Sequence, residues 1–149
     1  MQRALVVVED TDAHRTLLRE AGEIAAGTGA DLVLLLLEGV DEVDESREQY
    51  ARTEGVTYNE EEVLEAGKEF ITDFADDVLA DLDVAYEPAT AMVEQGARAT
   101  EIIDTATEHD CDHVFIVGEK RSPTGKALFG DMAQAVILNF VGPVTIRTA

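Results

Sequence analysis

Residues 4–8 read ALVVV and residues 32–37 read LVLLLL, and these uninterrupted apolar runs decide the fold. A strand that packs on one face alternates apolar and polar side chains, whereas a strand covered on both faces is apolar throughout. Both runs have the length of a buried strand and are too short to cross a membrane. Residues 114–117, VFIV, form a third run of this kind, which ends at Gly118.

The segments between these strands carry apolar residues at helical spacing. We expect four helices, marked by residues 17–25, 64–82, 99–106 and 128–140. Residues 38–57 are polar and acidic and are interpreted as a long loop. Two further extended segments, 84–93 with Pro88 and 144–147 with alternating side chains, are typical of strands at the edge of a sheet.

The alternation of strands and helices predicts an α/β fold: an open, five-stranded parallel sheet of Rossmann-like type with helices on both faces. Three central and two edge strands fit the order 3-2-1-4-5, within a single domain over residues 1–149. In that order the switch point lies between the first and fourth strands, where open α/β sheets bind ligands. We therefore expect the segments 9–12 and 118–130 to form the ligand-binding site.

The charge of the chain restricts its partners. With 32 acidic against 11 basic residues, the net charge is −21, and a field of this sign repels nucleic acids and anionic membranes. An acidic surface with few lysines suits a salty cytosol, where screening weakens self-repulsion. The single cysteine, Cys111, fits a reducing compartment, so we expect a cytoplasmic, salt-adapted protein.

The segment after the fourth strand combines features that suit a phosphate. Three of the eleven basic residues fall between Lys120 and Lys126, among glycines and hydroxyls and just before a helix N-terminus. The alternative is a solvated loop whose cations neutralise nearby acids. The spacing is not that of a Walker A loop, because six residues separate Gly118 from Gly125 and Ala127 follows Lys126.

Over essentially its whole length the chain resembles the universal stress protein family, as an acidic member of haloarchaeal type. Three stretches carry the resemblance. They are ALVVVEDT at 4–11, VEQGARATEIIDTATEHDCDHVFIVG at 93–118 and GDMAQAVILNFVGPVTI at 130–146. The resemblance implies a small, often dimeric stress-response protein, some relatives of which bind ATP. It implies a nucleotide site made of Glu9, Thr11, Leu37, Val93, Gly118, Arg121, Ser122, Thr124, Gly125, Lys126, Gly130 and Asp131.

The chain departs from the family's phosphate-binding pattern at three points. Arg121 stands where a second glycine is expected, the spacing to Gly130 is one residue short, and Asp131 replaces Ser or Thr. A carboxylate beside the outer phosphates repels their negative charge. AMP or ADP is therefore easier to accommodate than ATP with its Mg²⁺. Either Arg121 and Lys126 offset this charge, or Asp131 pairs with Lys126 and the site stays empty.

The last strand suggests a partner surface. Val144 and Ile146 point to one side of an exposed edge, and the resemblance implies a homodimer through this strand. Two readings stay open: a nucleotide-regulated dimer, and a nucleotide-free dimeric module whose surface and 38–57 loop contact an unknown protein. Slow ATP hydrolysis ranks last, because we find no catalytic residue.

Two histidine-containing segments are expected to be structural. The run at 109–113, HDCDH, crosses from a helix end into a strand, so its histidines diverge, and we expect no metal site. His14 is expected to be a first-turn helix residue rather than a general base.

Overall fold

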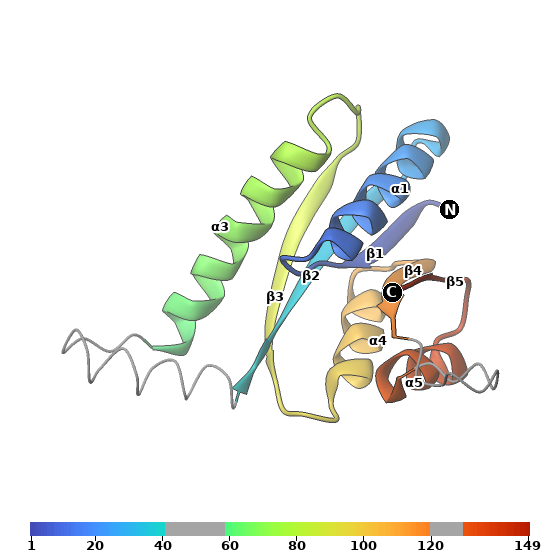
Figure 1. Cartoon of the computed structure of the whole chain (residues 1–149). Helices are drawn as coiled ribbons and strands as arrows, with labels where there is room; N and C mark the ends of the chain where they lie inside the picture. Colours follow the sequence, from blue (N-terminus) through green and yellow to red (C-terminus); the bar gives the residue numbers. More distant parts are fainter. Residues whose placement is uncertain (41–58, 120–129) are drawn as a thin grey trace.

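The computed structural model describes residues 1–40, 59–119 and 130–149, in which strands and helices alternate along the chain (Figure 1). The elements, in order, are β1 (Arg3–Val7), α1 (Asp12–Thr28), β2 (Asp31–Gly39), α3 (Glu60–Val78), β3 (Tyr86–Val93), α4 (Arg98–Glu108), β4 (His113–Gly118), α5 (Asp131–Asn139) and β5 (Val144–Thr148).

The five strands form one parallel sheet in the order β3-β2-β1-β4-β5. The predicted order is confirmed, with β3 and β5 at the edges. β1 lies in the middle, where Val6 pairs with Leu34 of β2 on one side and with Phe115 of β4 on the other.

Both faces of the sheet are covered, which is why the central strands are apolar throughout. Ala4 and Val6 of β1 point into a core shared with α1 and α3, whereas Leu5 and Val7 point into a second core shared with α4 and α5. All four side chains are at most 5% exposed. Figure 1 shows the two pairs of helices on opposite sides of the strands.

Local signals place the first helices. The Thr11 side chain accepts a hydrogen bond from the His14 backbone N–H at the start of α1, and Asn59 does the same for Glu62 at the start of α3. α1 ends at Gly29, whose φ of 73° lies in the left-handed region that favours glycine.

Two predicted boundaries are wrong. The loop expected from residue 38 begins later, because Glu38 and Gly39 extend β2 by pairing with Met92 and Val93 of β3. Residues 41–57 of that loop lie outside the described residues. Leu82, expected on the longest helix, follows the end of α3 and packs against the first core instead.

Within the described ranges, every helix is too short or too polar to span a lipid bilayer.

Candidate functional site

A cavity of about 590 Å³ opens at the carboxyl ends of β1 and β4. β1 leads into α1 on one face of the sheet, whereas α5, the next described helix after β4, packs on the opposite face, and the cavity lies where the two faces meet this end of the sheet. Its described walls come from the turn after β1, the first turn of α1, the β3–α4 turn, the end of β4 and the start of α5. This is the switch point that the strand order predicts.

Two helix N-termini face this cavity, since Gly96, Arg98 and Ala99 line it at α4, and Gly130 and Asp131 line it at α5. The N-cap residues of these two helices, Ala97 and Gly130, make no side-chain capping hydrogen bond. α1 and α3, by contrast, both carry side-chain caps. Backbone N–H groups at a helix start favour a negatively charged group, so this end of the cavity suits an anion.

Glu9 and His14 also line the cavity, and with Thr11 they form a group of three side chains in polar contact. His14 is 6% exposed, and its Nε2 lies 3.1 Å from Oε2 of Glu9. Its Nδ1 lies 2.6 Å from Oγ1 of Thr11. Burial lowers the pKa of His14, and the Glu9 carboxylate opposes this in part, so the imidazole is held neutral.

The charges around the cavity are mixed. In the described part of its lining, Arg98 is the cation other than histidine, and the acidic residues are Glu9, Glu119 and Asp131. Such a lining accommodates one phosphate group more readily than three, because each added negative charge meets these carboxylates.

The structure brings four of the predicted site residues to the cavity: Glu9, Gly118, Gly130 and Asp131. Thr11 caps α1 next to it and holds His14. Leu37 and Val93 do not line it, because both are buried in the second core at 6% and 3% exposure. Arg121, Ser122, Thr124, Gly125 and Lys126 lie outside the described residues.

The cavity is also lined by four residues that the sequence does not indicate: His14, Gln95, Gly96 and Arg98. The missed signal for His14 was its position in the first helical turn after the switch-point strand. For Gln95, Gly96 and Arg98, the missed signal was their position directly after the edge strand β3. The packing of α4 on the sheet brings this segment to the cavity.

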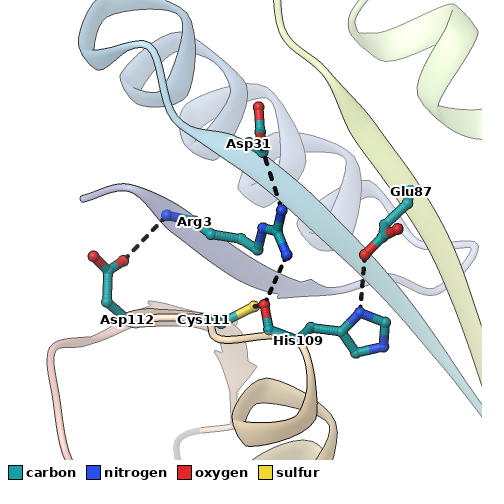
Figure 2. A network of polar contacts seen from close by, with 6 residues as sticks. All are labelled: Arg3, Asp31, Glu87, His109, Cys111 and Asp112. Carbon is teal, nitrogen blue, oxygen red and sulfur yellow. Dashed lines mark hydrogen bonds and ion pairs between the residues drawn. The ribbon is translucent and has the colours of Figure 1, made fainter.

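The segment 109–113 belongs to a different network, at the amino ends of the strands (Figure 2). The Arg3 guanidinium donates to the His109 carbonyl at 2.9 Å and lies 3.8 Å from the Asp31 carboxylate. His109 Nδ1 lies 2.9 Å from Oε1 of Glu87, whereas His113 Nε2 lies 2.8 Å from Oγ1 of Thr145. The two histidines thus diverge, toward β3 and β5.

Cys111, in the same segment, is half-buried, and burial together with nearby carboxylates raises its pKa to about 11. A search of the described residues finds no group of three or more His, Cys, Asp or Glu side chains that could hold a metal ion.

The β5 edge lies beside exposed apolar side chains. Val144 and Ile146 are half-buried against the second core. Leu138 at the end of α5 and Val141 in the following turn are 78% and 95% exposed. Apolar surface of this kind is typical of a protein–protein contact.

Comparisons with known proteins agree with this geometry. The model of the family described as "Universal stress protein family" matches residues 1–147. A search of curated proteins finds no match.

Several solved structures share the fold. A universal stress protein from Archaeoglobus fulgidus is 24% identical with a TM-score of 0.62, the match covering 98% of each chain. The universal stress protein from Archaeoglobus fulgidus in complex with dAMP is 20% identical, with a TM-score of 0.60 and coverage of 98% of this chain and 97% of that one. A universal stress protein in complex with cAMP is 17% identical, with a TM-score of 0.60 and coverage of 99% and 96%.

Proposed function

Because the chain belongs to the universal stress protein family, we propose that it is a regulatory protein that binds an adenine nucleotide in the cavity between Glu9 and Gly130. One observation carries this proposal: two helix N-termini, whose N-cap residues make no side-chain capping hydrogen bond, line one cavity at the switch point of the sheet. The complexes of similar structures with dAMP and cAMP support the choice of ligand class.

A nucleoside monophosphate fits this site better than ATP. Asp131 occupies the first position of α5, where outer phosphates would meet its carboxylate, and Glu119 adds a second negative charge. Arg98 balances one phosphate. Mg²⁺ would be present in the cavity only when ATP is bound, as part of the Mg-ATP ligand. We expect the bound nucleotide to change the surface that the protein presents to a partner, and not to undergo a reaction.

We also propose that the chain is an acidic, haloarchaeal-type member of the family, working as a homodimer in a salt-rich cytoplasm. The net charge of −21 supports the first part. The β5 edge, with Val144 and Ile146, and the exposed Leu138 and Val141 beside it support the second.

Calorimetric titration of the protein with AMP and with Mg-ATP, in concentrated potassium chloride, tests the nucleotide proposal. We expect saturable binding of AMP, weaker binding of ATP, and at least about tenfold weaker AMP binding in Arg98→Gln, which loses a charge-assisted contact. Lys68→Gln is the matched control, since Lys68 lies on α3 and pairs with Glu65. Absence of binding from the folded protein, or equal losses in both variants, would overturn the site.

The dimer proposal is tested by light scattering on the double variant Leu138→Ser, Val141→Ser. We expect its mass to fall from that of a dimer to that of a monomer. The control is Ile24→Ser on α1, which removes a side chain of 45% exposure from a different surface. A monomeric parent protein, or an unchanged dimer in the double variant, would contradict the proposal.

A second candidate function is a nucleotide-free interaction module, and the position of Asp131 favours it. A carboxylate in the first turn of α5 itself satisfies the helix dipole, as a phosphate would. Asp131→Ser separates the two functions. If the parent binds no nucleotide and this variant gains ATP binding, the nucleotide-free interaction module is the better description of the parent.

A further inference from the structure

We propose that His14 couples the binding of an anionic ligand in this cavity to the uptake of one proton. The inference rests on the proposed nucleotide site and adds its regulation: the same ligand binds more tightly as the pH falls. It follows from the position of His14 in the cavity wall, from its burial, and from the hydrogen bond and the ion-pair contact of its ring.

The polar contacts of the ring indicate its resting state. Oε2 of Glu9 lies 3.1 Å from Nε2 and carries negative charge, so it favours the tautomer with the hydrogen on Nε2. Nδ1 then carries the lone pair and accepts from the Thr11 hydroxyl at 2.6 Å. The same hydroxyl oxygen accepts from the His14 backbone N–H at 3.1 Å, so a neutral ring completes the helix cap.

Protonation needs no rearrangement of these heavy atoms. When Nδ1 gains a hydrogen it becomes a donor to the Thr11 oxygen, whose two lone pairs can accept from both the ring and the backbone. The Thr11 hydroxyl hydrogen then turns outward, since Thr11 is exposed, to water or to a ligand. The charged ring keeps its contact with Glu9, so the obstacle to protonation in the empty cavity is loss of solvent around the charge.

Among the described residues, the cations of α1 nearest His14 are paired at the α3 side, Asp12 in the same first turn is exposed, and the other charged groups of the cavity lining come from other elements. On its own helix, Arg15 and Arg19 pair with Asp77 and Asp81 at the α3 side. Across the cavity stand Arg98 of α4, Glu119 after β4 and Asp131 of α5. Glu9 is the carboxylate in direct contact with the ring. A bound anion adds a further negative charge near the ring, because His14 itself lines the cavity.

This arrangement sets the direction of the effect. A ligand anion favours the charged imidazole, so the complex holds a proton that the free protein lacks over a window of pH. Within that window the dissociation constant rises with pH, by at most about tenfold per pH unit for one proton. Below it, His14 is charged in both states and the affinity levels off.

Cyclic AMP is the probe for the test, because its phosphodiester has no proton to lose near neutral pH. AMP would confuse the result, since a phosphomonoester titrates with a pKa of about 6. Calorimetry at one pH, in two buffers with different heats of ionisation, gives the number of protons taken up per ligand bound. Repeating it over about pH 5 to 8 traces the window around the usual histidine pKa.

We expect up to one proton taken up by the parent protein and none by His14→Gln, whose amide is polar but does not titrate. The matched control is His109→Gln, since His109 also contacts a glutamate but lies in the network at the opposite end of the sheet. It should keep the uptake of the parent. As a second measurement, the NMR titration midpoint of the His14 ring should rise when cyclic AMP is added.

The outcomes separate the two levels of the argument. Binding of cyclic AMP without proton uptake, or uptake that persists in His14→Gln, would overturn the role of His14 and leave the nucleotide site standing. No binding of cyclic AMP, AMP or ATP at any pH would remove the site, and this inference with it.

Discussion

Cys111 lies half-buried between the end of α4 and the start of β4. Burial is the main reason that its pKa rises to about 11 from 9.0, and the carboxylates of Asp112, Glu87 and Asp110 add to it. The thiolate is the reactive form, so at about pH 8 the folded protein should be alkylated roughly 100-fold more slowly than an ordinary thiol. Thiol-labelling kinetics check this, with the urea-unfolded chain as reference. Equal rates in both states would contradict the assigned environment.

His113 gives the protein a pH-dependent stability. Its ring stacks on Phe115 with centroids 4.5 Å apart, contacts Thr145, and has its pKa lowered, mainly by burial. The unfolded chain therefore binds this proton more tightly than the folded protein does. The free energy of unfolding should fall as the pH drops below about 6.5, toward the lower pKa of the folded state.

Urea denaturation of the parent and of His113→Gln at several pH values measures this contribution. The slope of unfolding free energy against pH should be smaller in the variant between about pH 6.5 and 5. His14 also has a lowered pKa and keeps part of the slope in both proteins. Identical slopes would show that His113 is equally easy to protonate in the folded and unfolded states.

At the scale of single residues, the sequence predicts only part of the candidate site. Glu9, Gly118 and Gly130 are recognisable because they lie at or close to the ends of elements that meet at the switch point. Arg98 is not, since its helix follows an edge strand and reaches the cavity only through the packing of α4 on the sheet. His14 looks like a surface residue until its burial is known.

At the scale of elements, α5 offers a direct test of anion binding. Gly130, its N-cap, has φ −59° and ψ 162°, which any residue can adopt. Gly130→Asp places a carboxylate where it can accept from the first N–H groups of the helix, replacing the ligand's phosphate. We expect AMP binding to weaken by at least about tenfold while the thermal stability is retained or slightly raised.

The measurement pairs calorimetric titration with thermal unfolding of the same preparations. Gly130→Ala, which adds a side chain but no charge, is the control and should bind more tightly than the aspartate variant. If Gly130→Asp binds AMP as well as the parent does, the α5 N-terminus is not the phosphate site.

Elements are also the level at which sequence prediction succeeds best. Runs such as residues 4–8 and 114–117 have no polar positions, so they must be covered on both faces, and Pro88 restricts its strand to an edge. The start of the loop after β2 could not be predicted. Glu38 and Gly39 are polar or small, and they are strand residues because β3 continues beside them to Val93.

For the whole molecule, the dominant quantity is the net charge of −21. Ion pairs such as that between Arg19 and Asp81 use few of the carboxylates, and the remainder repel one another in the compact state. Salt shortens the range of this repulsion to about 3 Å at 1 M. We therefore expect the unfolding temperature to rise steeply between about 0.1 and 2 M potassium chloride.

Circular dichroism during heating measures the effect of salt. An uncharged osmolyte such as sucrose is the control, because it strengthens burial without screening charge. An unfolding temperature that does not change with potassium chloride would contradict both the electrostatic argument and the proposal of a salt-adapted protein.

The central place of β1 in the sheet has a consequence for how the chain is made. Of the two neighbours of β1, β2 leaves the ribosome soon afterwards, but β4 comes only after β3 and α4. Until then, a nascent chain with β1, β2 and β3 assembled carries the apolar strand β1 at an open edge, ready to pair with another chain. Synthesis that stops before His113 therefore yields a fragment prone to aggregation, so the full chain depends on translation passing quickly through α4.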